Sequence, residues 1–409
     1  MTALAARVGG IRWTHPKTIG VLGIILGALA FWLALPPLAA RTQALPLAIG
    51  ILAVAAGIWA WSRDQRRVGG GAIAAGILGL IFGVLATRSS SAHLNEVVVW
   101  SALGAATLRY ATPLTYAAIG GLYCERSGVI NVALEGMLLT GAFFGLLGVD
   151  LAHNWAGSAA WLVGLGVAAL AGMALAAIHA VWAIHLKVDQ IISGVALNFL
   201  ALGITGYLFI EKYGDTGTPG NISSYSIPDI HIAFMDHWYF IGPILGQMNL
   251  MIWLSFVLLI ATYLIVFRTP FGLRLRAVGE HPRAADTVGI SVYKTRYIAV
   301  IASGAIASMG GAYLSIGFVH SFNEGMTNGT GFIGLAALVF GKWRPFPTWA
   351  ATLLFGFSSA LADRLPSAYG NQWGTLFQAL PYLLTLIAVA GVIGRSIGPA
   401  AAGRPYVKQ

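Results

Sequence analysis

The stretch NLMIWLSFVLLIATYLIVF, residues 249–267, contains no charged side chain over nineteen consecutive positions. A helix rises about 1.5 Å per residue, so about 20 apolar residues cross the roughly 30 Å hydrocarbon core of a bilayer. This stretch therefore predicts a membrane-spanning helix. The whole chain has the same character, because 57% of its 409 residues are hydrophobic and only 9% are charged, against about 25% in soluble proteins. A soluble globular fold is excluded.

Eleven further apolar runs extend this prediction along the chain. The fold class that we predict is all-α, a polytopic helical membrane protein with about 10–12 transmembrane helices, interrupted or re-entrant segments and a pseudo-repeat. The run at 330–341 is short enough to be a half-helix or a re-entrant segment instead of a crossing. The other runs cover residues 18–39, 45–61, 70–86, 97–122, 133–149, 157–186, 191–210, 297–317, 348–361 and 374–394.

The basic residues are distributed unevenly between the two sides that these spans define. With the N-terminus inside, nineteen of the 24 Lys and Arg residues lie in cytoplasmic segments. Cytoplasmic loops of membrane proteins hold such an excess, so the net charge of +10 needs no nucleic acid partner to explain it. We expect both termini in the cytoplasm and the lipid bilayer as the main surrounding of the chain.

Polar residues interrupt the apolar pattern in ERSGVINVALEG, residues 125–136. Asn131 and Glu135 are four residues apart, so we expect them on one helix face, with Gly128 and Gly136 as break points. Irregular backbone at membrane depth is tolerated where it is buried in protein or lines a water-filled cavity. We therefore predict that Asn131 and Glu135 belong to a substrate pathway. For Glu135, a hydrogen-bond clamp between helices is the alternative.

A second polar cluster, DQIISGVALN at 189–198, opens the span at 191–210. We expect Asp189 to cap this helix, because the dipole of a helix N-terminus favours an anion. Asn198 lies deeper and offers amide donors and an acceptor to a polar ligand, so we add it to the predicted pathway. The tripeptide EGM occurs at 135–137 and again at 324–326, a weak pseudo-repeat of the kind that transporters contain.

Several catalytic signatures are absent from the sequence. It contains no phosphate-binding loop, no His-Glu-x-x-His zinc motif and no Gly-x-Ser-x-Gly nucleophile elbow. Its one cysteine, Cys124, excludes an internal disulfide and a cysteine-based metal site. We therefore expect no catalytic residue, no metal and no cofactor, and we expect any ATP hydrolysis to occur in another subunit.

These motifs resemble one family. ERSGVINVALEG and DQIISGVALN, followed by the cytoplasmic segment GLRLRAVGEHPRAADTVGI at 272–290 and by FGKWRP at 340–345, are similar to permease subunits of bacterial ABC importers for nucleosides and simple sugars, in the superfamily of branched-chain amino acid and ribose permeases. The resemblance implies a permease core at 96–395. An N-terminal region of about three helices at 1–95, without an assigned role, precedes it, and a cytoplasmic tail at 396–409 follows.

The resemblance also implies a function and partners. A nucleoside, or a related purine or sugar solute, would cross a bacterial cytoplasmic (inner) membrane by alternating access. The implied partners are a cytoplasmic ABC ATPase, a second permease subunit that is a paralogue, and an extracytoplasmic substrate-binding lipoprotein. The alternative is an ion-coupled secondary transporter of a small polar solute, with Glu135 or Asp189 as the proton carrier.

The loop at 269–296 is similar to the loop with which permeases of this family dock on their ATPase. We expect a short helix at 282–288 that lies across the membrane face and converts closure of the ATPase into movement of the transmembrane helices. A basic loop beside the lipid is the alternative. The ATPase contacts that the resemblance implies are Gly279, Glu280, Pro282, Ala284, Ala285 and Gly289.

Overall fold

The computed structural model describes most of the chain as helix. It describes residues 15–34, 44–88, 100–214, 217–235, 237, 242–369, 378–379, 381–382 and 397–408. Most of the predicted span at 374–394 lies outside these residues. The chain divides into two compact units, one formed by residues 1–103 and 361–395, the other by residues 104–360 and 396–409.

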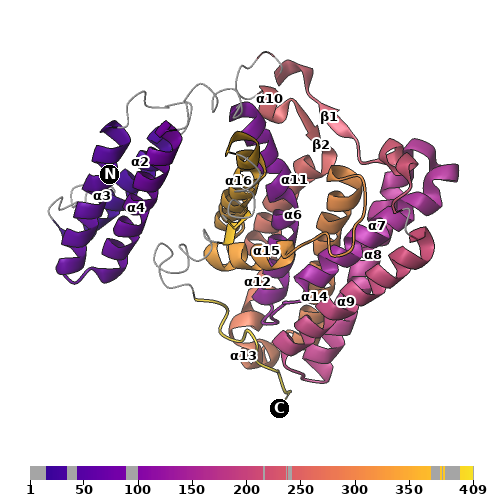
Figure 1. Cartoon of the computed structure of the whole chain (residues 1–409). Coiled ribbons are helices and arrows are strands. Elements are labelled where there is room, and N and C mark those ends of the chain that lie inside the picture. Colours follow the sequence, from indigo (N-terminus) through magenta and orange to yellow (C-terminus); the bar gives the residue numbers. More distant parts are fainter. Residues whose placement is uncertain are drawn as a thin grey trace. The chain divides into compact units, whose positions relative to one another are not determined.

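The first unit contains three helices that pack on one another (Figure 1): α2 (Pro16–Ala34), α3 (Ala44–Ser62) and α4 (Arg66–Arg88). Small side chains lie at their contacts, and Ala53, Ala60 and Ala72 are fully buried. Small residues let helix backbones approach closely, which is how helices associate where lipid removes the hydrophobic driving force.

The second unit contains the remaining long helices. α7 packs against α8, α9, α14 and α15, and α12 packs against α11 and α14. The helices are α6 (Trp100–Arg126), α7 (Leu134–Ala156), α8 (Ala160–Ala180), α9 (Gln190–Tyr213), α11 (Leu250–Arg268), α12 (Pro270–Glu280), α13 (Pro282–Thr287), α14 (Val292–Ala312), α15 (Thr330–Phe340) and α16 (Pro345–Tyr369). Residues 100–103 of α6 and 361–369 of α16 belong to the first unit. π-Helical turns extend α8 (Val181–His185) and α14 (Tyr313–Phe318).

The connection between α9 and α11 holds most of the short elements among the described residues of this unit. Strands β1 (Asp229–His231) and β2 (Gln247–Asn249) pair antiparallel, with Ile230 opposite Met248. The rest are 3₁₀ helices at Gly157–Ala159, between α7 and α8, at Gly220–Tyr225 and at Ala233–Met235, and the four-residue α10 (Gly242–Leu245).

Five helical runs among the described residues are long and apolar enough to cross a membrane. The longest, Leu134–His185, reverses direction between α7 and α8, which pack against each other, so it provides two antiparallel helices. The eleven-residue α15 is apolar but shorter, about 16 Å at the rise of a helix, in agreement with a half-helix. The other runs are Ala44–Ser62, Gln190–Tyr213, Leu250–Arg268 and Val292–Phe318. The all-α polytopic membrane fold is confirmed.

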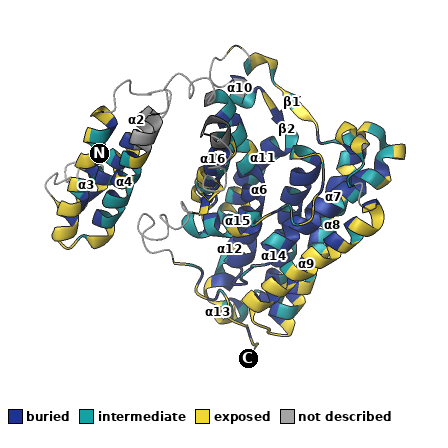
Figure 2. Ribbon diagram, viewed as in Figure 1, coloured by how far each residue is buried: buried dark blue, intermediate teal, exposed yellow. Residues whose placement is uncertain are grey.

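Burial separates an inner group of helices in the second unit from its outer faces. Figure 2 shows buried residues concentrated on α6, α7 and α14, whereas exposed residues line α9. Tyr116, Phe143 and Tyr313 are buried in the interior. On α9, Ile192, Phe199 and Tyr207 are each at least 66% exposed, a continuous apolar face of the kind that lipid or another subunit covers.

Candidate functional site

A helix break separates α6 from α7. Residues 127–133 are not helical, and Gly128, the second of them, has a φ of +88°. Asn131 therefore lies in the break, whereas Glu135 lies in the first turn of α7, and the prediction that they share a helix face is wrong. The physical reason is local, because Asn131 Oδ1 accepts a hydrogen bond from the Ala133 amide at 3.1 Å, a bond that competes with helix formation.

Asn131 also ties this break to α14. Its side chain is fully buried. Its Nδ2 atom donates to Ser303 Oγ at 2.9 Å and contacts Met137 Sδ at 3.4 Å. The amide of Asn131 is thus engaged on both its oxygen and its nitrogen within the chain.

Two further side chains satisfy the backbone of the break at Ile130. Gln190 Oε1 accepts from the Ile130 amide at 2.7 Å, and His179 Nε2 lies 3.0 Å from the Ile130 carbonyl oxygen. The other ring nitrogen of His179 lies 2.9 Å from Ser193 Oγ. Both backbone groups are therefore paired, as buried irregular backbone requires. Sequence reasoning misses His179 and Gln190, and the only signal for Gln190 is its place beside Asp189 in the second motif.

Asn198 joins α9 to α7 at the same place. Its Oδ1 accepts from the Gly136 amide at 2.8 Å, and its Nδ2 donates to the Val132 carbonyl at 3.0 Å. Asn198 is half-buried. Asp189 caps α9 as predicted, because its carboxylate accepts from two amides of the first turn at 2.8 and 3.1 Å. Gly136 is helical and is not a break point.

Glu135 connects α7 to the N-terminus of α15. Its carboxylate accepts hydrogen bonds from Thr327 Oγ1 at 2.7 Å and from the amides of Gly329 and Gly331 at 2.8 and 2.6 Å. The first amides of a helix lack partners within it and favour an anion, so the carboxylate acts as the cap of α15. The arrangement is a clamp between helices. It brings Asn131, Glu135 and Asn198 together around the first turn of α7.

The end of α6 is held by the turn that follows α15. Trp343 Nε1 donates to Glu125 Oε2 at 2.6 Å, and Arg126 donates to the Trp343 carbonyl from Nε at 3.0 Å and from Nη2 at 2.7 Å. Glu125 is only 4% exposed. Lys342 and Trp343 both have a positive φ, a conformation uncommon for residues other than glycine. The FGKWRP motif thus fixes the helix end from which the break begins.

The segment at 269–296 contains α12 and α13, so the predicted short helix at 282–288 is present. Pro270 and Pro282 occupy the first helical positions, where a missing N–H costs nothing. His281 breaks the two helices apart with a φ of −138° and a ψ of 80°. Ser291 then caps α14 through the Lys294 amide, so α13 leads directly into a long helix of the interior.

Two of the six predicted ATPase contacts face inward. Gly279 packs on the end of α6 so closely that an added Cβ atom would overlap the carbonyl oxygen of Arg126. Ala285 is 3% exposed and packs with Val278 and Val292. Both residues support the surface of α12 and α13 from beneath. The close approach at Gly279 also links α12 directly to the start of the helix break.

The other four predicted contacts form the surface itself. Glu280, Ala284 and Gly289 are exposed, and Pro282 is half-buried. Val288 follows α13 and is 74% exposed, although sequence reasoning omits it from the contacts. We call Glu280, Pro282, Ala284, Val288 and Gly289 the coupling surface.

Comparisons with known proteins agree with the motifs. The profile of the family described as branched-chain amino acid transport system / permease component matches residues 103–389. The guanosine ABC transporter permease protein NupQ of Bacillus subtilis (strain 168) is 41% identical over 322 residues, which is 77% of this chain and 99% of the relative. The nucleoside ABC transporter permease protein NupC of Lactococcus lactis subsp. cremoris (strain MG1363) is 35% identical over 328 residues, which is again 77% of this chain and 99% of the relative.

A third relative differs in the substrate that its name gives. The putative glucose ABC transporter permease protein TsgC13 of Haloferax volcanii is 37% identical over 264 residues, which is 64% of this chain and 77% of the relative. No solved structure matches the chain significantly. The family resemblance of the four motifs is confirmed, and the chain belongs to the permease family described as branched-chain amino acid transport system / permease component.

Proposed function

We propose that this chain is the transmembrane permease subunit of an ABC importer that moves nucleosides by alternating access. A separate cytoplasmic ATPase hydrolyses the ATP. The names of NupQ and NupC support the substrate class. The observation that carries the mechanism is the backbone contact of Gly279 with Arg126, because a force applied to α13 reaches the helix break through it.

The break is the part of the proposed pathway that moves. Asn131 is buried and holds the break to α14, so it acts as a support. Glu135 and Asn198 are half-buried, so part of each residue stays accessible for a solute to contact. Amide and carboxylate groups suit the hydroxyl and base edges of a nucleoside.

The remaining partners follow from the ABC importer assignment. We place the chain in a bacterial cytoplasmic membrane with both termini in the cytoplasm, as the distribution of Lys and Arg favours. A paralogous permease would complete the pathway, and a substrate-binding lipoprotein would deliver the solute from outside. The apolar face of α9 is available to the second permease or to lipid.

The test is uptake by the reconstituted transporter. We expect ATP-dependent uptake of radiolabelled guanosine to exceed that of glucose and of leucine, the solute classes named for TsgC13 and for the family. Preference for either competitor would overturn the nucleoside assignment alone. Uptake that follows a proton gradient without an ATPase would overturn the importer and favour the ion-coupled alternative.

A matched pair of variants tests the coupling surface. Val288→Arg places a charge on the exposed end of α13, and Leu273→Arg makes the same change on α12, where Leu273 is 63% exposed. We expect the first to abolish ATP-dependent uptake and the second to retain most of it, at equal amounts of membrane-inserted protein. Equal loss in both variants would contradict the assignment of the ATPase contact to α13.

A further inference from the structure

The C-terminal tail lies along the coupling surface. Figure 1 shows the yellow C-terminal segment running past α13. The Ala401 amide donates to the Gly279 carbonyl at 2.9 Å, and the Ala400 amide donates to Glu280 Oε2 at 3.2 Å. The tail is therefore attached to the same two residues that end α12.

A buried arginine attaches the tail a second time. Arg296, in the first turns of α14, is 1% exposed. Its Nε donates to the Ser127 carbonyl in the helix break at 3.2 Å, and its Nη1 donates to the Arg404 carbonyl in the tail at 3.3 Å. A buried guanidinium is costly unless it is hydrogen-bonded, so the tail contributes to keeping Arg296 in the interior.

Tyr406 completes the apolar core beneath α13. It is 6% exposed and belongs to one cluster with Val278, Ala285 and Val292. The hydroxyl of Tyr293 donates to the Tyr406 carbonyl at 3.4 Å, and the two rings contact edge to face. Burial, followed by the neighbouring Asp286, raises the pKa of the Tyr406 phenol. The tail is thus packed into the coupling region through both hydrogen bonds and apolar contacts.

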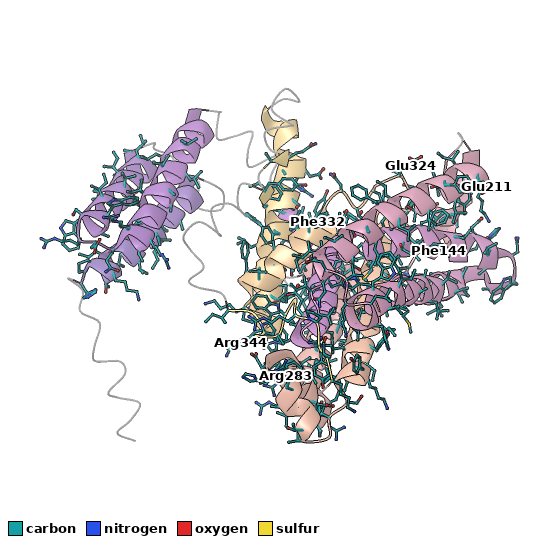
Figure 3. The ribbon with its side chains drawn as sticks, turned by 90° about the horizontal axis from the view of Figure 1, so that it is seen from below. Phe144, Glu211, Arg283, Glu324, Phe332 and Arg344 are labelled. Carbon is teal, nitrogen blue, oxygen red and sulfur yellow. The ribbon has the colours of Figure 1, made fainter. Side chains whose placement is uncertain are left out.

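A pocket of about 320 Å³ lies between the tail and the end of α12. Arg283 and Arg404 are both exposed at it, and Figure 3, seen from the side of α13, labels Arg283. The pocket lining holds these two guanidinium groups and a single carboxylate, Glu280, which accepts the Ala400 amide, so the pocket carries a net positive charge. Its lining residues are Glu280, His281, Pro282, Arg283, Ala400, Ala401, Arg404, Pro405, Tyr406 and Val407.

We propose that the tail is part of the ATPase docking surface and that this pocket receives an acidic side chain of the ATPase. The inference rests on the proposed function, because the partner is the ATPase that drives the permease. Two observations select this occupant. The pocket is continuous with the coupling surface through Glu280 and Pro282, and its two guanidinium groups match a carboxylate in charge and geometry.

The test compares two charge reversals in the same tail. Arg404→Glu changes the pocket but leaves the Arg404 carbonyl that Arg296 binds. Lys408→Glu makes the same change at an exposed position outside the pocket lining. The ATPase recovered with the wild-type permease, identified by its phosphate-binding loop, is purified and titrated against each permease in nanodiscs at low salt. We expect Arg404→Glu to weaken binding by about tenfold or more and Lys408→Glu by less than about twofold.

The salt dependence and a third variant make the result decisive. Binding by the wild type should weaken as salt rises, and binding by Arg404→Glu should depend on salt less steeply. If both tail variants bind as the wild type while Val288→Arg does not, the tail inference is wrong and the proposed function stands. If both tail variants weaken binding equally, the pocket is excluded as the acceptor. If the wild type binds no ATPase, both proposals fall.

Discussion

The helix break and the coupling surface differ in where their polar groups find partners. In the break and in the first turn of α7 that follows it, Asn131 and Glu135 are engaged by Ser303 and by the N-terminus of α15. On the coupling surface, Ala284 and Gly289 are exposed and Val288 presents an apolar side chain to solvent. Unpaired polar groups are too costly at membrane depth, whereas apolar side chains gathered on a surface in water mark an interaction site.

This difference predicts that the helix break contributes to stability and that the coupling surface contributes to transport. Substitutions in the break should lower the free energy of unfolding, because they leave buried donors or acceptors without partners. Except at Gly289, whose backbone is left-handed, substitutions on the coupling surface should change stability little and affect transport. The two regions meet at Gly279 and at Arg296, so a movement of one can reach the other.

The largest loss of stability is expected for Glu135→Ala. The substitution leaves Thr327 Oγ1 and the amides of Gly329 and Gly331 without their acceptor. Charge-assisted hydrogen bonds contribute about 1.5–3 kcal/mol each, and less between membrane helices, so we expect a loss of about 3 kcal/mol. Unfolding in mixed micelles measures it.

Glu135→Gln is the control for this prediction. The amide keeps one acceptor oxygen but turns a donor toward one of the two backbone amides, so its stability should lie between those of the wild type and Glu135→Ala. If both variants unfold as the wild type does, the clamp contributes nothing, and Glu135 is free for a ligand instead.

The bond between Asn131 and Ser303 should give a smaller effect. Asn131→Ala also removes the acceptor of the Ala133 amide, so we expect it to cost about 1–2 kcal/mol. A double-mutant cycle with Ser303→Ala isolates the contact between α14 and the break. A coupling energy of about 0.6 kcal/mol or more is expected, and additive effects would show that the contact is energetically neutral.

The helices were predictable from the sequence because the bilayer fixes the length of an apolar run. The predicted span at 249–267 corresponds to α11 at Leu250–Arg268. The prediction that Asn131 and Glu135 share one helix face is wrong because a four-residue spacing places two residues on one face only inside a helix. Here Gly128 adopts a left-handed backbone, and Asn131 bonds its own local backbone, which delays the start of α7 to Leu134.

The side chains that bind the backbone of the break were also not predictable from the sequence. His179 and Gln190 bind the backbone of Ile130, and a backbone partner leaves no mark in the pattern of side chains. The contact between the tail and α14 was not predictable either, because Arg296 binds the backbone carbonyl group of Arg404. The resemblance supplied the coupling segment but could not separate its buried residues, Gly279 and Ala285, from its exposed ones.

Each region contains a glycine with a left-handed backbone, so the same substitution can be compared in both. Gly128 in the break has a φ of +88° and Gly289 after α13 has a φ of +82°. Alanine in this conformation costs about 1–2 kcal/mol at either position. At Gly128 the added Cβ atom would also lie 3.0 Å from Arg296 Nη2, whereas at Gly289 nothing lies within 4 Å. We therefore expect Gly128→Ala to be more destabilising by denaturant unfolding, and equal losses would contradict the packing argument.

The smallest effect on stability is expected for Val288→Ser. Val288 is 74% exposed, and substitutions at such positions usually change the free energy of unfolding by less than about 0.5 kcal/mol. Its apolar side chain has no role in the fold of this chain, so any role belongs to a partner that covers it. ATP-dependent uptake should therefore fall severalfold while the unfolding midpoint stays unchanged. A lower unfolding midpoint with unchanged uptake would contradict this prediction. It would place Val288 in the fold of the permease and remove it from the ATPase contact.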